Sequence, residues 1–270
     1  MTPPVELLVD VGQGKVQVDT SGSGPDFVIL HSLLTGPEAF DRVAGSLSED
    51  MTVHRVHLPG FGASTPLGST EVSLSDLADV VATSMEGLGC GPETVVLGNG
   101  LGSFVALTLA IRHGDRFGAL IASNTGPTFP DDRKGAFHTM AGIAESEGMA
   151  AVADIAVARI FPPSYVQAHP EATTQRRLVL EAIDPIAFAA ACRALAVLDL
   201  SEHLAEIVNP TLVVLGSIDQ TTPPEMGRAV AAAIRQATTA EIPGCGHCPQ
   251  LEKPDALLAV IERFLEDQTG

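Results

Sequence analysis

Tryptophan is absent from the sequence, and tyrosine occurs once among 270 residues. Proteins that hold single-stranded nucleic acid usually stack its bases on aromatic side chains, so no such platform is expected. Basic residues are also scarce. The chain has 15 lysines and arginines against 33 aspartates and glutamates, which gives a net charge of −18. Because so acidic a surface repels phosphate backbones and anionic lipids, we expect neither nucleic acid nor a membrane as a partner.

Long apolar runs are missing too, since none approaches the length of a membrane span. The first residues lack the basic and apolar regions of a secretory signal. Four cysteines are too few for a disulfide framework, so the sequence predicts a reduced, cytoplasmic protein. Cys245 and Cys248 have CxxC spacing, but no second pair accompanies them, which argues against a zinc site.

Known cofactor motifs are not found either. The glycines at positions 98, 100 and 102 lack the G-x-G-x-x-G spacing of a dinucleotide site, and they come late in the sheet rather than after its first strand. We expect no metal, flavin or nicotinamide.

What the sequence does contain is alternating strands and helices, with enough apolar residues (45%) for a sizeable core. Strands are predicted at residues 6–11, 15–19, 27–31, 52–58, 94–99, 117–123, 211–216 and 238–242. Helices are predicted at residues 73–88, 101–113, 131–147, 149–160, 173–183, 185–196, 224–235 and 254–266. This alternation is typical of an α/β fold with a mostly parallel sheet between layers of helices.

The strands stop between residues 127 and 203, where only helices are predicted. Pro162-Pro163 and His169-Pro170 are expected to interrupt these helices. We therefore predict a core formed by residues 1–126 and 204–270, and a helical cap formed by residues 127–203. The cap should cover the carboxyl edge of the sheet, where open α/β sheets bind ligands.

One segment has the layout of a nucleophile elbow. Residues 95–103 read VVLGNGLGS, so that a strand enters a sharp turn and then a helix. The corresponding motif is G-x-S-x-G, whose serine attacks the substrate. Here the central residue is Gly100. A glycine-rich strand–helix turn alone could be purely structural.

Three further loops argue against a purely structural turn. Asp219 follows the strand at 211–216, and His247 lies in a glycine-flanked loop after the last strand. Residues 31–36, HSLLTG, follow the third strand, where a backbone N–H can stabilise an oxyanion. The order elbow, acid, histidine is that of the α/β-hydrolases.

The chain thus resembles the α/β-hydrolase superfamily over nearly its full length, and within it the 3-oxoadipate enol-lactonase group. Segments similar to that group lie at residues 32–35, 147–154, 161–171, 184–192 and 222–224. The Gly98-Asn99 start of the elbow is instead similar to the C–C hydrolases of meta-cleavage products. The resemblance implies an ester, lactone or C–C bond hydrolase that needs no cofactor.

The resemblance also implies residue roles. Asp219 is the acid, His247 the general base, and Leu33 and Leu101 supply the oxyanion-hole N–H groups. Gly100 occupies the nucleophile position.

The chain departs from the family pattern at that position. It also departs at His57, where an aspartate is common, and which we take as a structural histidine. Ser103 lies one turn into the helix and is expected to pack rather than to act as a displaced nucleophile.

A glycine at the elbow admits three interpretations. The natural enzyme has serine and this chain is a variant of it. Alternatively, the glycine is natural, and His247 with Asp219 activates water or moves a proton in a C–C cleavage, lyase or cyclisation reaction. Finally, the protein could be a pseudoenzyme that only binds a ligand. The intact acid–histidine pair argues against this last interpretation.

The expected partner is a small-molecule substrate, and a homo-oligomer is compatible with the sequence. We expect Ser32, Arg133 and Phe161 as substrate contacts, with Arg133 or Arg159 able to bind a carboxylate. Each arginine could equally be an exposed surface charge. The enol-lactonase resemblance implies a small acidic lactone.

Overall fold

The computed structural model describes residues 3–69 and 71–269, so residues 1, 2, 70 and 270 of the predicted core lie outside it. An eight-stranded sheet forms the centre, in the order β1-β2-β4-β3-β5-β6-β7-β8. Its strands are β1 (Val5–Asp10), β2 (Lys15–Gly22), β3 (Asp26–Leu30), β4 (Thr52–Val56), β5 (Val95–Asn99), β6 (Ala119–Ser123), β7 (Thr211–Gly216) and β8 (Ala237–Ile242). Strand β2 pairs antiparallel with β1 and β4, and the remaining pairs are parallel. The predicted α/β-hydrolase fold is confirmed.

Helices cover both faces of this sheet. The helices of the core are α1 (Asp41–Leu47), α2 (Leu74–Leu88), α3 (Leu101–His113), α9 (Pro224–Ala233), α10 (Pro249–Glu252) and α11 (Pro254–Thr269), with 3-10 turns at Pro37–Phe40, Gly114–Arg116 and Leu204–Glu206. Strand residues alternate between two hydrophobic clusters: Val28 and Leu30 pack with α2, α3 and α9, whereas Phe27 and Ile29 pack with α1 and α11. Burial on both faces explains why the central strands are almost wholly apolar.

Helix α2 shows how local sequence sets an element's ends. The Ser73 side chain accepts a hydrogen bond from the Asp76 N–H, and Asp76 accepts one from the Ser73 N–H, which forms a capping box. The helix ends at Gly89, whose φ of 78° is left-handed. Ser73, the first residue of the helix predicted at 73–88, is therefore the N-cap of α2.

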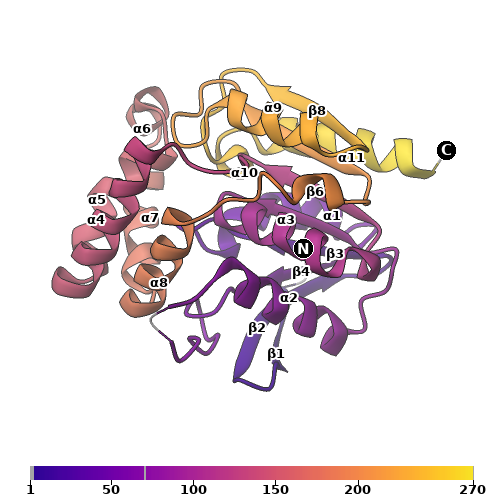
Figure 1. Ribbon diagram of the computed structural model, residues 1–270, viewed down its shortest axis with the longest axis horizontal. Coiled ribbons are helices and arrows are strands. Elements are labelled where there is room, and N and C mark those ends of the chain that lie inside the picture. Colours follow the sequence, from indigo (N-terminus) through magenta and orange to yellow (C-terminus); the bar gives the residue numbers. More distant parts are fainter. Residues whose placement is uncertain (1–2, 70, 270) are drawn as a thin grey trace.

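Five helices lie between β6 and β7, within residues 127–203, and Figure 1 shows them gathered at one side of the molecule. They are α4 (Asp131–Glu147), α5 (Met149–Ile160), α6 (Pro163–Ala168), α7 (Pro170–Glu181) and α8 (Pro185–Ala196). The prolines lie at breaks between helices, as predicted, because α5 ends at Ile160 and α6 at Ala168. Pro163 and Pro170 begin helices α6 and α7, because proline's fixed φ suits the first helical position and its missing N–H costs nothing there.

The sequence predicts neither α1 nor α6. These helices have seven and six residues, which is too short for a recognisable hydrophobic period.

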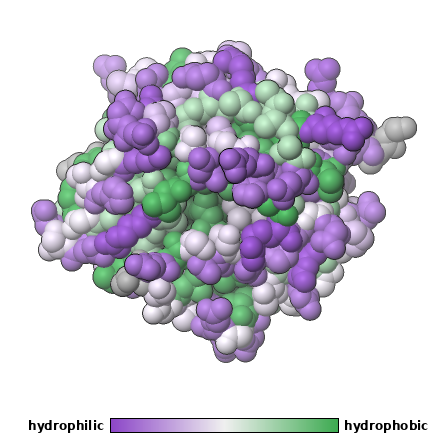
Figure 2. All heavy atoms as spheres, in the orientation of Figure 1, coloured by the Kyte–Doolittle hydropathy of each residue, from purple (hydrophilic) through white to green (hydrophobic). Residues whose placement is uncertain are grey.

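The face in Figure 2 is largely hydrophilic, with apolar residues showing in patches between polar ones. No helix in the described part of the chain is long and apolar enough to cross a membrane.

Candidate active site

Gly100 is the only residue between the end of β5 and the start of α3. Its φ of 54° and ψ of −119° would cost a non-glycine residue roughly 1–3 kcal/mol. The backbone is also crowded on both sides of this turn. A Cβ on Gly98 would lie 2.1 Å from the Gly102 carbonyl oxygen, and a Cβ on Gly102 would lie 2.2 Å from that of Leu30. The structure thus has the strand–turn–helix arrangement that the sequence predicts, with Gly100 at its tip.

His247 lies beside this tip, in the loop between β8 and α10. Its Nδ1 is 2.9 Å from Oδ2 of Asp219, and both side chains are almost completely buried. A Cβ on Gly100 would be 3.1 Å from Nε2 of His247. When Asp219 is ionised, Nδ1 donates to it, and the unprotonated Nε2 faces the elbow. This is the arrangement of a general base oriented by an acid.

Asp219 is held by more than the histidine. Its Oδ2 accepts hydrogen bonds from Asn124 Nδ2 (2.8 Å) and Thr222 Oγ1 (2.7 Å), and its Oδ1 accepts from the N–H groups of Thr221 (2.8 Å) and Thr222 (3.1 Å). Burial alone would raise the pKa of Asp219. The charge and hydrogen bond of His247, with the bonds from Asn124 and Thr222, outweigh burial and lower that pKa. The group therefore stays a carboxylate and stabilises a protonated His247.

Asn124 is a site residue that the sequence analysis missed. It directly follows β6 and adopts a φ of 53°, which asparagine tolerates better than most residues. Its Nδ2 also donates to the Gly246 carbonyl oxygen at 3.1 Å, so one amide joins the acid loop to the histidine loop. The sequence feature that could have indicated Asn124 is the polar pair Ser123-Asn124 at the carboxyl end of a buried strand.

Asn99 and Gln250 form a second hydrogen-bonded connection to the histidine loop that the sequence analysis did not predict. Asn99 Nδ2 donates to the His247 carbonyl oxygen (3.1 Å), and Gln250 Nε2 donates to Asn99 Oδ1 (3.0 Å). The residue preceding the elbow tip therefore fixes the backbone of the histidine loop.

Glu252 anchors the same loop from its other side. Its carboxylate accepts hydrogen bonds from the N–H groups of Gly246 (2.8 Å) and Cys248 (3.0 Å). Burial raises the pKa of Glu252, although these two bonds oppose the rise.

The predicted oxyanion donors line a cavity with a volume of about 30 Å³ at the elbow. Its lining consists of Ser32, Leu33, Leu34, Gly100, Leu101, Phe104, Phe129, Phe137, Met140, Arg159, Leu195, Thr221, Thr222 and His247. Within residues 3–69 and 71–269, the backbone N–H groups of Leu33 and Leu101 donate no hydrogen bond. Both are therefore available to a bound oxygen atom.

A larger cavity of about 280 Å³ adjoins the first, sharing Phe129, Phe137, Arg159 and Thr221 with it. Arg159 is half-buried between the two, and its guanidinium has no hydrogen bond or ion pair with any other described residue. Burial lowers the pKa of Arg159, but a guanidinium remains charged at neutral pH. The site thus contains a cation that has no counter-ion among the described side chains.

Arg133, an expected substrate contact, lines the larger cavity and not the cavity at the elbow. Its Nη1 donates to the carbonyl oxygens of Gln220 (3.0 Å) and Thr221 (3.4 Å), in the loop that carries the acid. Phe161 lies outside the linings of both cavities and stacks on Tyr165, with ring centroids 4.6 Å apart.

Two other residues singled out in the sequence have local partners. Ser103 Oγ donates to the Gly100 carbonyl oxygen at 2.7 Å, so this hydroxyl braces the elbow. His57 Nε2 lies 3.0 Å from Asp19 Oδ2, while its Nδ1 has no partner among the described residues.

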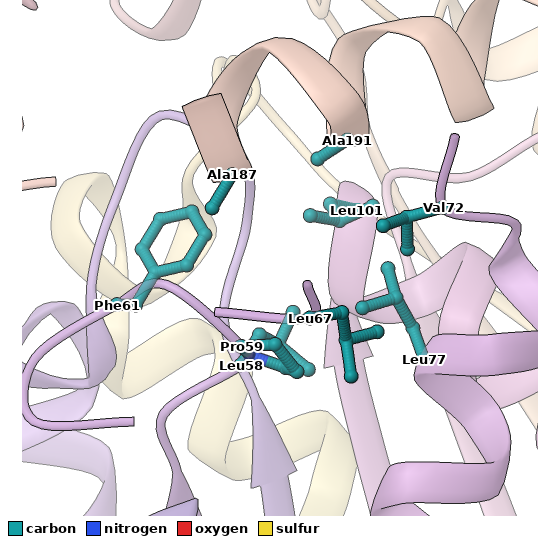
Figure 3. A pocket seen from close by; sticks show the side chains of 9 residues that line it. All are labelled: Leu58, Pro59, Phe61, Leu67, Val72, Leu77, Leu101, Ala187 and Ala191. Atoms are coloured by element: carbon teal, nitrogen blue, oxygen red, sulfur yellow. The ribbon is translucent and has the colours of Figure 1, made fainter. Parts of the chain in front are cut away.

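A small apolar cavity of about 10 Å³ lies beside Leu101, the first residue of α3 (Figure 3). Its lining is Leu58, Pro59, Phe61, Leu67, Val72, Leu77, Leu101, Ala187 and Ala191. The Leu101 side chain points into it (Figure 3), and Leu101 also lines the cavity at the elbow.

Potential metal ligands gather away from this site. Ligand atoms of Asp26, His54 and Cys90 lie within 4.8 Å of one another. His54 uses both ring nitrogens in hydrogen bonds, to Asp26 (2.9 Å) and to Thr20 (3.0 Å). Burial raises the pKa of Cys90 to about 12, so its thiol is neutral. The hydrogen bonds of His54 therefore explain why these side chains lie close together, without a metal ion.

The CxxC pair does not form a shared site either. Cys245 packs into the cluster with α1 and α11, and Cys248 into the cluster on the opposite face of the sheet. Burial raises the pKa of both thiols.

Comparison with known proteins agrees with this geometry. Residues 27–260 match the Alpha/beta hydrolase family. A pimeloyl-[acyl-carrier protein] methyl ester esterase from Nitrosospira multiformis is 30% identical over 94% of this chain and 99% of its own. The 3-oxoadipate enol-lactonase 2 of Acinetobacter baylyi is 26% identical over 90% of this chain and 89% of its own.

A solved structure points the same way. The crystal structure of the enol-lactonase from Burkholderia xenovorans LB400 superimposes with a TM-score of 0.90 at 26% identity, covering 96% of this chain and 100% of that chain. The resemblance to enol-lactonases is confirmed, and the comparisons add a group of esterases. The chain belongs to the α/β-hydrolase family and is an enzyme of the hydrolase type.

Proposed function

We propose that this chain hydrolyses a small ester or lactone that carries a carboxylate, and that His247 and Asp219 drive the reaction by acting on water. One observation carries the proposal. The 2.9 Å contact between Nδ1 of His247 and Oδ2 of Asp219 turns Nε2 of the histidine toward an elbow that has no nucleophilic side chain.

The reaction follows from the atoms present. Nε2 of His247 accepts a proton from water, and the water oxygen bonds to the substrate carbonyl carbon. The N–H groups of Leu33 and Leu101 stabilise the resulting oxyanion. As the carbonyl re-forms, the bond to the leaving oxygen breaks, and His247 returns its proton to that oxygen. No acyl-enzyme forms, because Gly100 offers no atom to carry the acyl group.

Two observations support the substrate class. The relatives named above are a methyl ester esterase and enol-lactonases, and a lactone is a cyclic ester, so the same kind of bond is cleaved. The half-buried guanidinium of Arg159 at the cavity, which has no counter-ion among the described side chains, favours a substrate carboxylate, since a charge removed from water is costly until it is paired. We propose that helices α4–α8 form a cap over the cavity in which Arg159 binds the carboxylate.

Hydrolysis by the wild type and by His247→Ala tests the proposal, using small lactones and methyl esters with and without a free carboxylate. Loss of the base should lower kcat about 10²- to 10⁴-fold. His203→Ala, which removes an exposed histidine, should match the wild type. Substrates with a free carboxylate should have the higher kcat/KM.

The alternatives give different results. A ligand-binding protein would show no turnover and would bind its ligand equally well after His247→Ala. A lyase, cyclase or C–C hydrolase would leave every ester and lactone intact while converting another substrate. Either result overturns the proposal.

A further inference from the structure

The Ser32 side chain occupies space next to the elbow where a nucleophile's side chain would begin. A Cβ placed on Gly100 would lie 2.3 Å from Ser32 Oγ and 3.0 Å from Ser32 Cβ. A side chain at position 100 and the present position of Ser32 are therefore incompatible. The absence of a side chain at one position is matched by the presence of a hydroxyl from another loop.

The Ser32 hydroxyl has no hydrogen-bond partner among the described residues. The residue as a whole is 2% exposed, and no hydrogen bond joins its Oγ to any other residue that the structure describes. Ser32 lines the cavity at the elbow, and its Oγ is not among the side-chain atoms that are both fully buried and unpaired. The hydroxyl is therefore open to a group that enters that cavity.

The rest of Ser32 is fixed firmly. Its N–H donates to Thr35 Oγ1 (3.2 Å), and its carbonyl oxygen accepts from His31 Nδ1 (2.9 Å) and from the Thr35 N–H (3.3 Å). Burial lowers the pKa of His31 to about 4, so that ring is neutral and its Nε2 accepts from the Leu58 N–H at 3.1 Å. The hydroxyl is thus presented from a rigid backbone.

Ser32 and His247 flank the same point. The position of a Gly100 Cβ is 2.3 Å from Ser32 Oγ and 3.1 Å from His247 Nε2. The cavity volume of about 30 Å³ exceeds the ~10–15 Å³ that one water needs, and a buried water requires two to four polar partners. The two side chains provide two such partners, which leaves the N–H groups of Leu33 and Leu101 for the substrate oxygen.

We propose that Ser32 is a catalytic residue whose hydroxyl, together with His247 Nε2, holds the hydrolytic water above Gly100. This inference rests on the proposed hydrolysis and identifies how its nucleophile is held. The water gives one proton to Nε2 and keeps its other hydrogen. Its oxygen bonds to the carbonyl carbon while Ser32 Oγ fixes its direction of attack. Ser32 itself gains and loses no covalent bond.

The geometry favours water over Ser32 as the attacking group. A serine nucleophile needs a base within hydrogen-bond distance of its own hydroxyl. Within the described part of the chain, the imidazole ring of His247 hydrogen-bonds Asp219 and Thr222, and no hydrogen bond joins it to Ser32.

Ser32→Ala tests this assignment, with Ser84→Ala as the matched control. Ser84 is also fully buried, but its hydroxyl bonds the Val80 carbonyl oxygen on α2. Loss of water positioning should lower kcat about 10- to 100-fold in Ser32→Ala and leave KM within about twofold, because the hydroxyl acts on water rather than on the substrate. Thermal unfolding of both variants checks that each is folded. Equal kcat in Ser32→Ala and Ser84→Ala would overturn the proposal.

Mass spectrometry after rapid quenching separates the two chemical roles of Ser32. We expect no acylated peptide in the wild type. An acyl group on the peptide that contains Ser32 would show that serine is the nucleophile, and would also overturn the proposal.

A crystal structure of each form gives a measurement that does not depend on turnover. The wild type should hold an ordered water bonded to both Ser32 Oγ and His247 Nε2, and Ser32→Ala should lose it. If that water is present but no ester or lactone is cleaved, the proposed hydrolysis fails and the water site stands. If esters are cleaved and no such water is found, the Ser32 assignment fails and the hydrolysis stands.

Discussion

The two halves of the candidate site are built in opposite ways. On the base side, Asp219 accepts hydrogen bonds from His247, Asn124, Thr222 and the backbone, so every lone pair has a use. On the nucleophile side, Gly100 has no side chain, and the Ser32 hydroxyl borders the cavity without a hydrogen bond to any described residue. The two halves therefore serve different steps: the saturated half orients a base, and the open half can receive a molecule.

The largest effect expected from disturbing the base side comes from Asp219→Asn. The amide would favour the wrong tautomer of His247, so that Nε2 would carry the proton and could not accept one. By analogy with the same change in the serine protease triad, kcat should fall on the order of 10⁴-fold. Steady-state kinetics on the best lactone or ester measures this loss. Asp115→Asn, at an exposed position, should leave kcat unchanged. A loss below about tenfold would show that Asp219 does not orient the base.

A smaller effect is expected on the free energy of unfolding, through His31 in the loop that holds Ser32. Burial lowers the pKa of His31 from 6.5 to about 4, with nearby His57 also lowering it and Glu38 opposing. As the pH falls below 6.5, the unfolded chain binds a proton that the folded chain excludes. Stability is therefore lost as pH falls, by about 3 kcal/mol between pH 7 and pH 4. Urea unfolding across this range measures the loss, and His31→Asn should reduce it. Parallel curves for the two proteins would contradict a buried neutral His31.

The smallest effect tests whether Ser32 and Gly100 share space. Gly100→Ala should cost about 1–3 kcal/mol from its positive φ, plus the contact with Ser32 Oγ. Gly89→Ala has a φ of 78° with nothing within 4 Å of the added Cβ, so it reports the backbone cost alone. Adding Ser32→Ala to Gly100→Ala should recover about 1 kcal/mol as a coupling energy. Strictly additive free energies of unfolding would show that the two positions do not compete for the same space.

Sequence reasoning succeeded where the pattern is long and local. The helices at 101–113, 131–147, 149–160 and 185–196 begin and end where the sequence predicts. The elbow, acid and histidine loops also meet, because each follows a strand at the carboxyl edge of one sheet.

The site residues that the sequence did not predict are held by contacts between residues far apart in the chain. Asn124 and Asp219 are 95 residues apart, and Asn99 and Gln250 are 151 apart. No local pattern records these pairs. Ser32 was expected to contact substrate, but its unpaired hydroxyl and its distance from the elbow can be measured only in the folded chain.

Helices α4 and α5 are hydrogen-bonded to the loop that carries Asp219. Arg133 of α4 donates hydrogen bonds to the carbonyl oxygens of Gln220 and Thr221, and the Thr221 hydroxyl donates to the carbonyl oxygen of Arg159 in α5. Any movement of α4 and α5 away from the core would break these bonds and free the segment next to Asp219. The orientation of the base therefore depends on the position of these two helices.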